Sequence, residues 1–172
     1  IKFMIKIVSD SSALYSKEDG QVKGISILPL IVTINGSTYN EYEDIKTKEF
    51  IDIINEGHIP VSSQPAIGEV LNVYNENEDC EIINISMADG LSGTYNSACV
   101  AKEMAENSKR IEEINSGTLC GPQKYLVDLA VKLVELGKNK DEIVNEINKA
   151  KEILAYEITK LVHGEEEAKK AE

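Results

Sequence analysis

Hydroxyl-bearing side chains follow the predicted strands of this chain, and they are the residues best suited to binding or chemistry. In the central stretch, residues 82–105, an apolar run leads into the turn Asp-Gly-Leu-Ser-Gly-Thr at residues 89–94 and then into a helix-compatible run. A strand that passes through a Gly/Ser turn into a helix leaves backbone N–H groups without partners, and these groups attract anions together with the helix dipole. We therefore expect Ser92 and Thr94 to bind a carboxylate or phosphate. Gly93 would admit this ligand close to the backbone because glycine has no Cβ.

The turn at Ser92 also has a structural interpretation, in which Ser92 is the N-cap of the following helix. A similar choice applies to the cluster Ser9-Asp10-Ser11-Ser12, which follows the first predicted strand. These side chains either cap the next turn or line a cleft at the carboxyl end of a parallel sheet. A predicted loop at residues 60–65 places Ser62 and Ser63 between two prolines, and its structural alternative is an ordinary serine-capped helix entry.

These hydroxyl groups lack the partners that catalysis requires. A serine hydrolase would use Ser92 as its nucleophile, but Gly90-Leu91-Ser92-Gly93 does not match the G-x-S-x-G turn. The only histidines available as a base are His58 and His163, and both fall at the ends of predicted helices. The sequence has no P-loop, no G-x-G-x-x-G after a strand and no His/Cys cluster with metal-ligand spacing. We therefore expect a binding protein without enzymatic activity, cofactor or metal.

The composition limits the class of protein and its partners. The chain has 172 residues, of which 42% are hydrophobic and 28% charged, as in one globular domain with or without an appendage. Its net charge of −12 disfavours nucleic acids and anionic membrane surfaces as partners. The apolar run at residues 1–8 is too short for a signal peptide or a membrane span, which predicts no membrane insertion. Three widely separated cysteines without a C-x-x-C motif indicate buried thiols in a reducing cytoplasm.

The hydrophobic pattern predicts strands that alternate with helices, and this alternation would place the turns along one edge of a sheet. The predicted strands cover residues 3–8, 25–34 with a break at Pro29, 82–86 and 111–114, and a hairpin at Asn35-Gly36 returns through residues 37–39. The predicted helices cover residues 47–56, 65–74, 95–105, 122–136 and 139–164, with a glycine-marked loop at 20–24 and a charged, solvated helix end at 165–172. This order predicts an α/β fold with a mostly parallel sheet and helices on both faces.

Four blocks of sequence resemble the DegV family of fatty-acid-binding proteins in their order and rough spacing. The blocks are Val8-Ser9-Asp10-Ser11-Ser12-Ala13, Leu28-Pro29-Leu30, Ser63-Gln64-Pro65 followed by Gly68-Glu69, and Leu91-Ser92-Gly93-Thr94-Tyr95-Asn96-Ser97-Ala98. The resemblance covers about residues 3–148 and implies the fold of the family's N-terminal domain. It also implies that the protein binds a long-chain fatty acid such as palmitate or oleate. Such a protein presents the acid to a fatty acid kinase and is not itself the kinase.

Carried over by position, the resemblance implies that Ser62 and Ser92 bind the fatty-acid carboxylate, with Gly93 and Thr94 beside Ser92. The family has threonine at the position of Ser62, so the hydroxyl is kept. The two loops are expected to meet at the carboxyl ends of neighbouring strands, and the acyl chain is expected to enter an apolar tunnel between two domains. The sequence departs from the family at Asp89, whose charge disfavours a nearby anion. The family's second α/β domain is also expected to be missing.

Residues 149–172 resemble a different protein, namely a helix of bacterial tyrosyl-tRNA synthetases near the junction with their RNA-binding domain. The alternative is the general similarity among amphipathic helices. Neither synthetase signature, His-Ile-Gly-His or Lys-Met-Ser-Lys-Ser, is present, so no aminoacylation is expected. The sequence thus predicts a lipid-binding domain at residues 1–148 and a helical appendage at 149–172. The alternative function is a non-binding assembly module that forms a homodimer through its open apolar half-tunnel.

Overall fold

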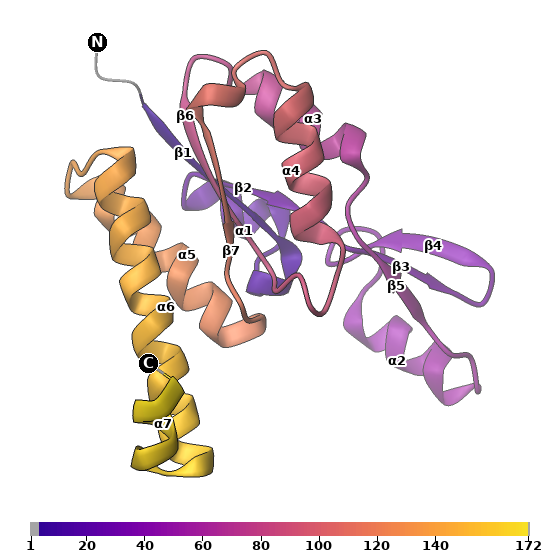
Figure 1. Ribbon diagram of the computed structural model, residues 1–172. Helices are drawn as coiled ribbons and strands as arrows, with labels where there is room; N and C mark the ends of the chain where they lie inside the picture. Colours follow the sequence, from indigo (N-terminus) through magenta and orange to yellow (C-terminus); the bar gives the residue numbers. More distant parts are fainter. Residues whose placement is uncertain (1–3, 172) are drawn as a thin grey trace.

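The structure, a computed structural model, describes residues 4–171 and contains two β-sheets in separate parts of the molecule (Figure 1). The larger sheet is parallel throughout, with the strand order β2-β1-β6-β7. Its strands are β1 Ile5–Asp10, β2 Ile25–Leu28, β6 Glu81–Ser86 and β7 Ile111–Asn115. The predicted mostly parallel sheet is therefore confirmed, although Phe3 of the predicted first strand lies outside the described residues. Because the strands are parallel, their carboxyl ends all lie along one edge of the sheet.

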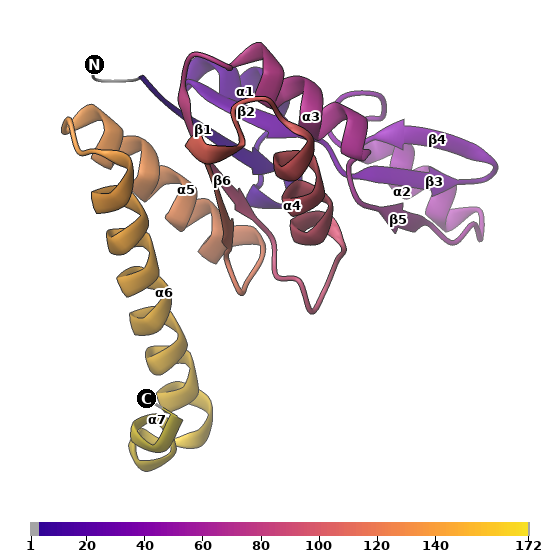
Figure 2. The ribbon, with the colours of Figure 1, turned by 45° about the horizontal axis from the view of Figure 1, so that its top comes forward.

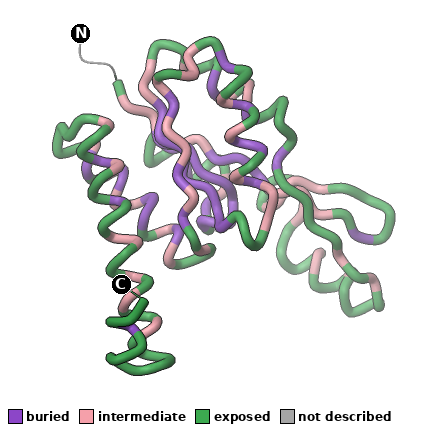
Figure 3. The backbone as a smooth tube through the Cα atoms, in the orientation of Figure 1, coloured by how far each residue is buried: buried purple, intermediate pink, exposed green. Residues whose placement is uncertain are grey.

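Helices cover both faces of the parallel sheet, as the alternating pattern predicted. The helices are α1 Lys17–Val22, α3 Ile67–Glu76, α4 Thr94–Met104, α5 Cys120–Glu135 and α6 Lys140–His163, with short 3₁₀ turns η1 Ser11–Ala13 and η2 Ser108–Arg110. On one face, Ile83 and Ile85 pack with Leu126 of α5 and Ile147 of α6. On the other face, Ile82 packs among residues of α3 and α4. Side chains alternate along a strand, so each strand supplies both cores. The buried residues are concentrated in the strands of this sheet (Figure 3).

A small antiparallel unit lies to one side of the parallel sheet. Its strands are β3 Ile31–Ile34, β4 Ser37–Asn40 and β5 Val61–Ser63 in the order β4-β3-β5, and α2 Thr47–Asn55 connects β4 to β5. The predicted hairpin is confirmed, because Asn35 and Gly36 form the turn between β3 and β4 with φ values of 49° and 75°. These positive values suit the Asn-Gly pair of a two-residue hairpin turn. Pro29 separates β2 from β3, so the predicted strand 25–34 divides between the two sheets.

The distal half of α6 extends away from the sheet, and the short helix α7 Glu165–Ala171 folds back against it (Figure 2). Gly164, with a φ of 89°, makes the reversal between the two helices. A cavity of about 710 Å³ lies between α6 and α7 and is lined in part by Tyr156 and Ala168. Helix α6 is buried at Ile143 and Ile147, whereas Leu161 near its C-terminal end is 87% exposed.

Several local predictions differ from the structure. The predicted glycine loop at residues 20–24 contains the end of α1, in which a Cβ on Gly20 would meet the side chain of Ile27 at 2.5 Å. The predicted loop at residues 60–65 contains strand β5. Helix α3 begins at Ile67, two residues after Pro65, and the charged end at 165–171 is a separate helix instead of a solvated continuation of α6.

Candidate functional site

The polar cluster after β1 serves as an internal junction of the fold. The Asp10 carboxylate is buried and accepts hydrogen bonds from the Ser12 backbone N–H at 3.0 Å, the Met87 N–H at 2.8 Å and Gln123 Nε2 at 3.1 Å. The Ser12 hydroxyl also lies within hydrogen-bond reach of both Asp10 Oδ1 and Gln123 Oε1 and can donate its single proton to one of them at a time. Asp10 therefore joins the ends of β1 and β6 to α5, and the capping interpretation of this cluster is the one that the structure supports.

The other hydroxyls of this cluster are also used within the protein. Ser9 Oγ donates to the Ile85 carbonyl oxygen at 2.6 Å. Ser11 Oγ accepts from the Leu30 N–H at 2.9 Å and donates to Glu41 Oε2 at 2.6 Å, which ties the parallel sheet to the start of the small antiparallel unit. These groups are part of the framework that holds the carboxyl edge of the sheet together.

The turn after β6 contains three of the predicted site residues in one compact arrangement. The Ser92 and Thr94 hydroxyl oxygens lie 2.9 Å apart, and the Thr94 N–H donates to Ser92 Oγ at 3.3 Å. Thr94 is buried, whereas Ser92 is only half-buried and can reach a ligand. The N-cap of α4 is Gly93, so the interpretation of Ser92 as the N-cap was wrong by one residue. The first-turn N–H groups of α4 lie beside this turn and lack carbonyl partners within the helix.

The strand that carries Ser62 reaches this turn through the side chain of Gln64. Ser62 is exposed on β5 and pairs with Val32 in the antiparallel sheet, so it does not follow a strand of the parallel sheet as expected. Two residues later, Gln64 Nε2 donates to Ser97 Oγ of α4 at 2.7 Å. A Cβ placed on Gly93 would lie 2.2 Å from Gln64 Oε1. The structure therefore brings the Gln64 linker onto the α4 turn, and the Gln64 amide occupies space over Gly93 that we expected a ligand to use.

Exposed apolar side chains lie beyond the carboxyl ends of the three neighbouring strands β1, β6 and β7. Leu14, Leu91 and Leu119 follow these strands in turn and are 45%, 61% and 38% exposed. Tyr42 of the small unit lies near Cys120 at the start of α5. Burial is the main cause that raises the pKa of the Tyr42 phenol, and the nearby Glu41 and Cys120 raise it further. The carboxyl edge thus combines the hydroxyl turn with exposed apolar groups, an arrangement suited to an amphipathic ligand.

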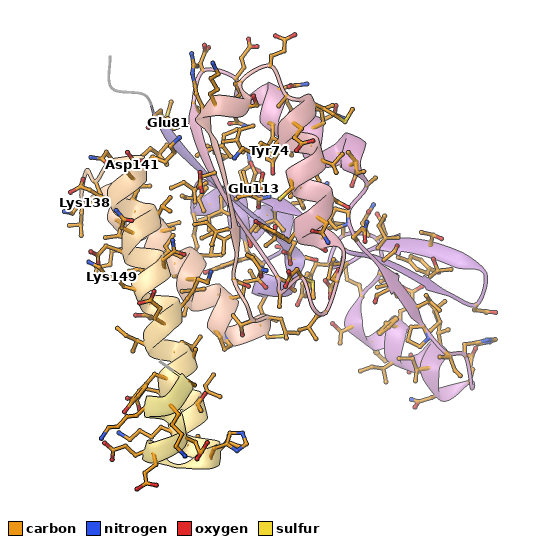
Figure 4. The ribbon with its side chains drawn as sticks, viewed as in Figure 1. Tyr74, Glu81, Glu113, Lys138, Asp141 and Lys149 are labelled. Atoms are coloured by element: carbon orange, nitrogen blue, oxygen red, sulfur yellow. The ribbon has the colours of Figure 1, made fainter. Side chains whose placement is uncertain are left out.

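A buried polar group that the sequence did not reveal lies on the α3/α4 face of the sheet (Figure 4). The Tyr74 hydroxyl donates to Glu113 Oε1 at 2.5 Å, and Asn84 Nδ2 donates to Glu113 Oε2 at 3.0 Å. Burial raises the pKa of Glu113 to about 7, and the bonds from Tyr74 and Asn84 oppose this shift. The sequence alone does not single out Glu113, because it lies beside Glu112 in the same strand. Only its contacts with Tyr74 of α3 and Asn84 of β6 distinguish it from Glu112.

The described residues, 4–171, contain no group of three or more His, Cys, Asp or Glu side chains placed to hold a metal ion. Within the same range, no helix is both long enough and apolar enough to cross a membrane. Cys80, Cys99 and Cys120 are free thiols, and Cys80 and Cys99 are partly buried, whereas Cys120 is exposed. Asp89 is exposed, so water solvates the charge that the sequence places near the proposed anion site.

Sequence comparisons relate this chain to bacterial proteins of one family. Residues 4–159 match the family described as "Uncharacterised protein, DegV family". A DegV domain-containing protein of Staphylococcus aureus is 37% identical over 148 residues, which are 85% of this chain and 52% of the relative. A DegV domain-containing 15.5 kDa protein of the same species is 36% identical over 136 residues, covering 78% of this chain and 96% of that relative. The chain therefore spans about half the length of one relative and nearly all of another.

Solved structures show the same fold. The fatty acid binding protein DegV from Bacillus subtilis superposes with a TM-score of 0.80 and 29% identity, covering 87% of this chain and 54% of that one. A fatty acid kinase B3 protein from Streptococcus pneumoniae, loaded with linoleic acid, has a TM-score of 0.75 at 19% identity over 87% of this chain and 54% of that one, and shows the fold alone. The match over residues 4–159, together with these relatives, shows that the chain belongs to the DegV family.

Proposed function

We propose that this chain binds a long-chain fatty acid and holds its carboxylate at the turn formed by Ser92, Gly93 and Thr94, with Ser62 as a second hydroxyl donor. The observation that carries this proposal is the junction at Gln64, which brings the strand bearing Ser62 onto the α4 turn. Ser92 is half-buried and lies beside first-turn N–H groups, so it offers donors to an anion. The B. subtilis relative is described as a fatty acid binding protein, which supports the same ligand class here.

The exposed apolar groups at the carboxyl edge explain why the ligand would be an acid with a long chain. Leu91 lies one residue before Ser92 and is 61% exposed, and Leu119 follows the adjacent strand β7. An acyl chain that covers such groups gains roughly 0.8 kcal/mol for each CH₂ removed from water. Palmitate and oleate are therefore suitable probes.

The test of this function is direct titration of delipidated protein with oleate and palmitate, together with mass spectrometry of the lipid extracted after denaturation. Ser62→Ala and Ser92→Ala should each weaken binding roughly tenfold or more, because each removes a hydrogen bond to a charged group. Ser37→Ala, which removes an exposed hydroxyl from β4, is the matched control and should bind as the wild type does. Wild-type protein that binds neither acid, or serine variants that bind unchanged, would contradict the proposal.

We infer that the chain acts as a carrier and not as an enzyme. The Ser92 hydroxyl is engaged with the Thr94 hydroxyl and N–H, which suits a hydrogen-bond donor better than an activated nucleophile. We also propose that the bound acid is presented to a kinase; the S. pneumoniae neighbour, which shares the fold, is named a fatty acid kinase B3 protein. Free thiols at three positions support a cytoplasmic location. Hydrolysis of an acyl ester that disappears in Ser92→Ala would overturn the carrier function.

A second candidate function is a homodimer that buries the carboxyl edge of the sheet. The exposed side chains of Leu14, Leu91 and Leu119 favour it, because a second copy of the chain would remove these apolar groups from water. Light scattering on lipid-free protein distinguishes the two functions. A stable dimer that binds no oleate supports the assembly function, whereas a monomer that binds oleate supports the carrier.

A further inference from the structure

Gln64 makes a contact with α4 that is unusual for a surface residue. Its amide nitrogen donates to Ser97 Oγ at 2.7 Å, and Ser97 is 4% exposed. Its amide oxygen lies where a side chain on Gly93 would begin, 2.2 Å from an ideal Cβ at that position. The amide therefore lies against the first turn of α4, over Gly93 and Ser97.

Glycine at position 93 is explained by this contact and not by its backbone conformation. Gly93 has a φ of −72° and a ψ of 2°, which any residue can adopt. A methyl group at this position would collide with the Gln64 amide, and one of the two would have to move. Gly93 and Gln64 thus form a complementary pair, in which the missing Cβ of one residue makes room for the amide of the other.

The contact matters because it is one of the polar ties between the small antiparallel unit and the α/β body. Ser11 bonds both Leu30 and Glu41, and the Lys17 N–H at the start of α1 donates to Glu43 Oε1 at 2.8 Å. The Gln64 tie follows directly after β5 at the end of the unit. Between them, the strand carrying Ser62 is exposed and covered by little else, so its position relative to Ser92 depends on these ties.

We propose that Gln64 is a positioning residue of the carboxylate site. By holding the first turn of α4 against the end of β5, Gln64 sets the distance between the Ser62 and Ser92 hydroxyls so that one carboxylate can accept hydrogen bonds from both. The inference rests on the proposed function and extends it to a residue whose amide is already occupied within the protein. Affinity for a carboxylate would then depend on Gln64 even though Gln64 itself contacts α4.

Two measurements test this role in the full chain. The first compares affinities for oleate and for methyl oleate, which has the same chain but no anionic head group. In Gln64→Ala, oleate affinity should fall roughly three- to tenfold, the effect of one neutral hydrogen bond, while methyl oleate affinity changes by less than about twofold. Ser97→Ala should reproduce this selective loss, and the double variant should lose no more than either single variant because both remove one interaction.

The second measurement is hydrogen exchange of the backbone amides at residues 92–97 without ligand. Exchange should accelerate in Gln64→Ala and stay unchanged in Gln21→Ala, a matched removal of an exposed amide from α1. Gly93→Ala should accelerate it in the wild-type background, because it displaces the Gln64 amide, and should add nothing in the Gln64→Ala background.

The outcomes separate the two proposals. Unchanged exchange in Gln64→Ala, or an equal fall in affinity for oleate and methyl oleate, overturns the positioning role. If wild-type protein binds neither oleate nor palmitate while exchange still accelerates in Gln64→Ala, the proposed function fails and Gln64 is only a structural brace. If the serine variants lose oleate affinity and Gln64→Ala does not, the site stands without Gln64.

Discussion

At the scale of single residues, Asp10 ends β1 and Ser92 lies in the turn after the neighbouring strand β6, yet their polar atoms are used differently. The Asp10 carboxylate is enclosed and accepts hydrogen bonds from Met87, Gln123 and Ser12, which leaves no open position for a ligand. Ser92 is half-buried, and its hydroxyl contacts only the turn that contains it. Binding at the carboxyl edge of this sheet is therefore expected at the α4 turn and not at the cluster after β1.

Glu113 should give the protein a pH-dependent stability. Burial raises the pKa of Glu113 from 4.5 to about 7, so the folded protein holds this proton more tightly than the unfolded chain does. The contribution of Glu113 to the free energy of unfolding is then largest below about pH 4.5, decreases as the pH rises to about 7 and is constant above that. The full change is on the order of 3–4 kcal/mol, since one pKa unit corresponds to about 1.4 kcal/mol.

Urea unfolding of wild type and Glu113→Gln between pH 5 and 8 measures this contribution as a difference between the two proteins. The wild type should lose stability relative to Glu113→Gln as the pH rises, because the glutamine cannot ionise. Glu112→Gln is the control, because Glu112 is next to Glu113 on β7 and its side chain projects to the opposite face of the sheet. A wild type and a Glu113→Gln variant whose stabilities run parallel across this range would show that the carboxyl titrates normally.

At the scale of elements, the sequence predicted those features whose cause is local. The Asn35-Gly36 turn requires positive φ values that these residue types tolerate, and the hairpin formed as predicted. The capping box of α6 is also present, because Asn139 and Glu142 satisfy each other's backbone N–H groups at 3.0 Å. Such signals lie within four residues of each other, so no tertiary contact is needed to read them.

The missed elements depend on contacts between distant residues. Strand β5 is three residues long and exposed, and it is a strand only because β3 pairs with it. Helix α1 contains Gly20, a residue type that indicates a loop unless the packing of Ile27 against it is known. The cap that Ser16 and Asp19 form at the start of α1 is a local signal in the sequence. The candidate site divides in the same way. The hydroxyl turn was predicted from its residues, whereas the role of Gln64 depends on α4, 33 residues away in the chain.

The capping box predicts a measurable loss of stability at the α6 N-terminus. Asn139→Ala removes the acceptor for the Glu142 N–H and should lower the free energy of unfolding by about 1 kcal/mol. Asn145→Ala, an exposed asparagine within the same helix, is the matched control and should change stability by less than about 0.5 kcal/mol. Equal effects of the two variants in urea unfolding would mean that the start of α6 is held by packing alone.

At the scale of the whole molecule, the helical tail continues the α/β body without a break. Helix α6 runs from Lys140 to His163 across the predicted boundary at residues 148/149, and the family match continues to residue 159. The division into a domain at 1–148 and an appendage at 149–172 stays a prediction, as does the resemblance of the appendage to a synthetase helix. Burial offers a different division of α6, since its first half packs on the sheet and its second half contacts α7.

Because the two halves of α6 differ in burial, truncating a large apolar side chain to alanine should cost much more stability in the first half than in the second. Ile147 is fully buried in the core, so Ile147→Ala should lower the free energy of unfolding by about 2–5 kcal/mol. Leu161 is 87% exposed, so Leu161→Ala should change it by less than about 0.5 kcal/mol. In a chain of this size the first variant should lower Tm by roughly 4 °C or more and the second by roughly 2 °C or less. If Leu161→Ala instead destabilises the protein, and does so more at high than at low protein concentration, the distal half of α6 is covered by a second copy of the chain in solution, at an interface separate from the carboxyl edge of the sheet.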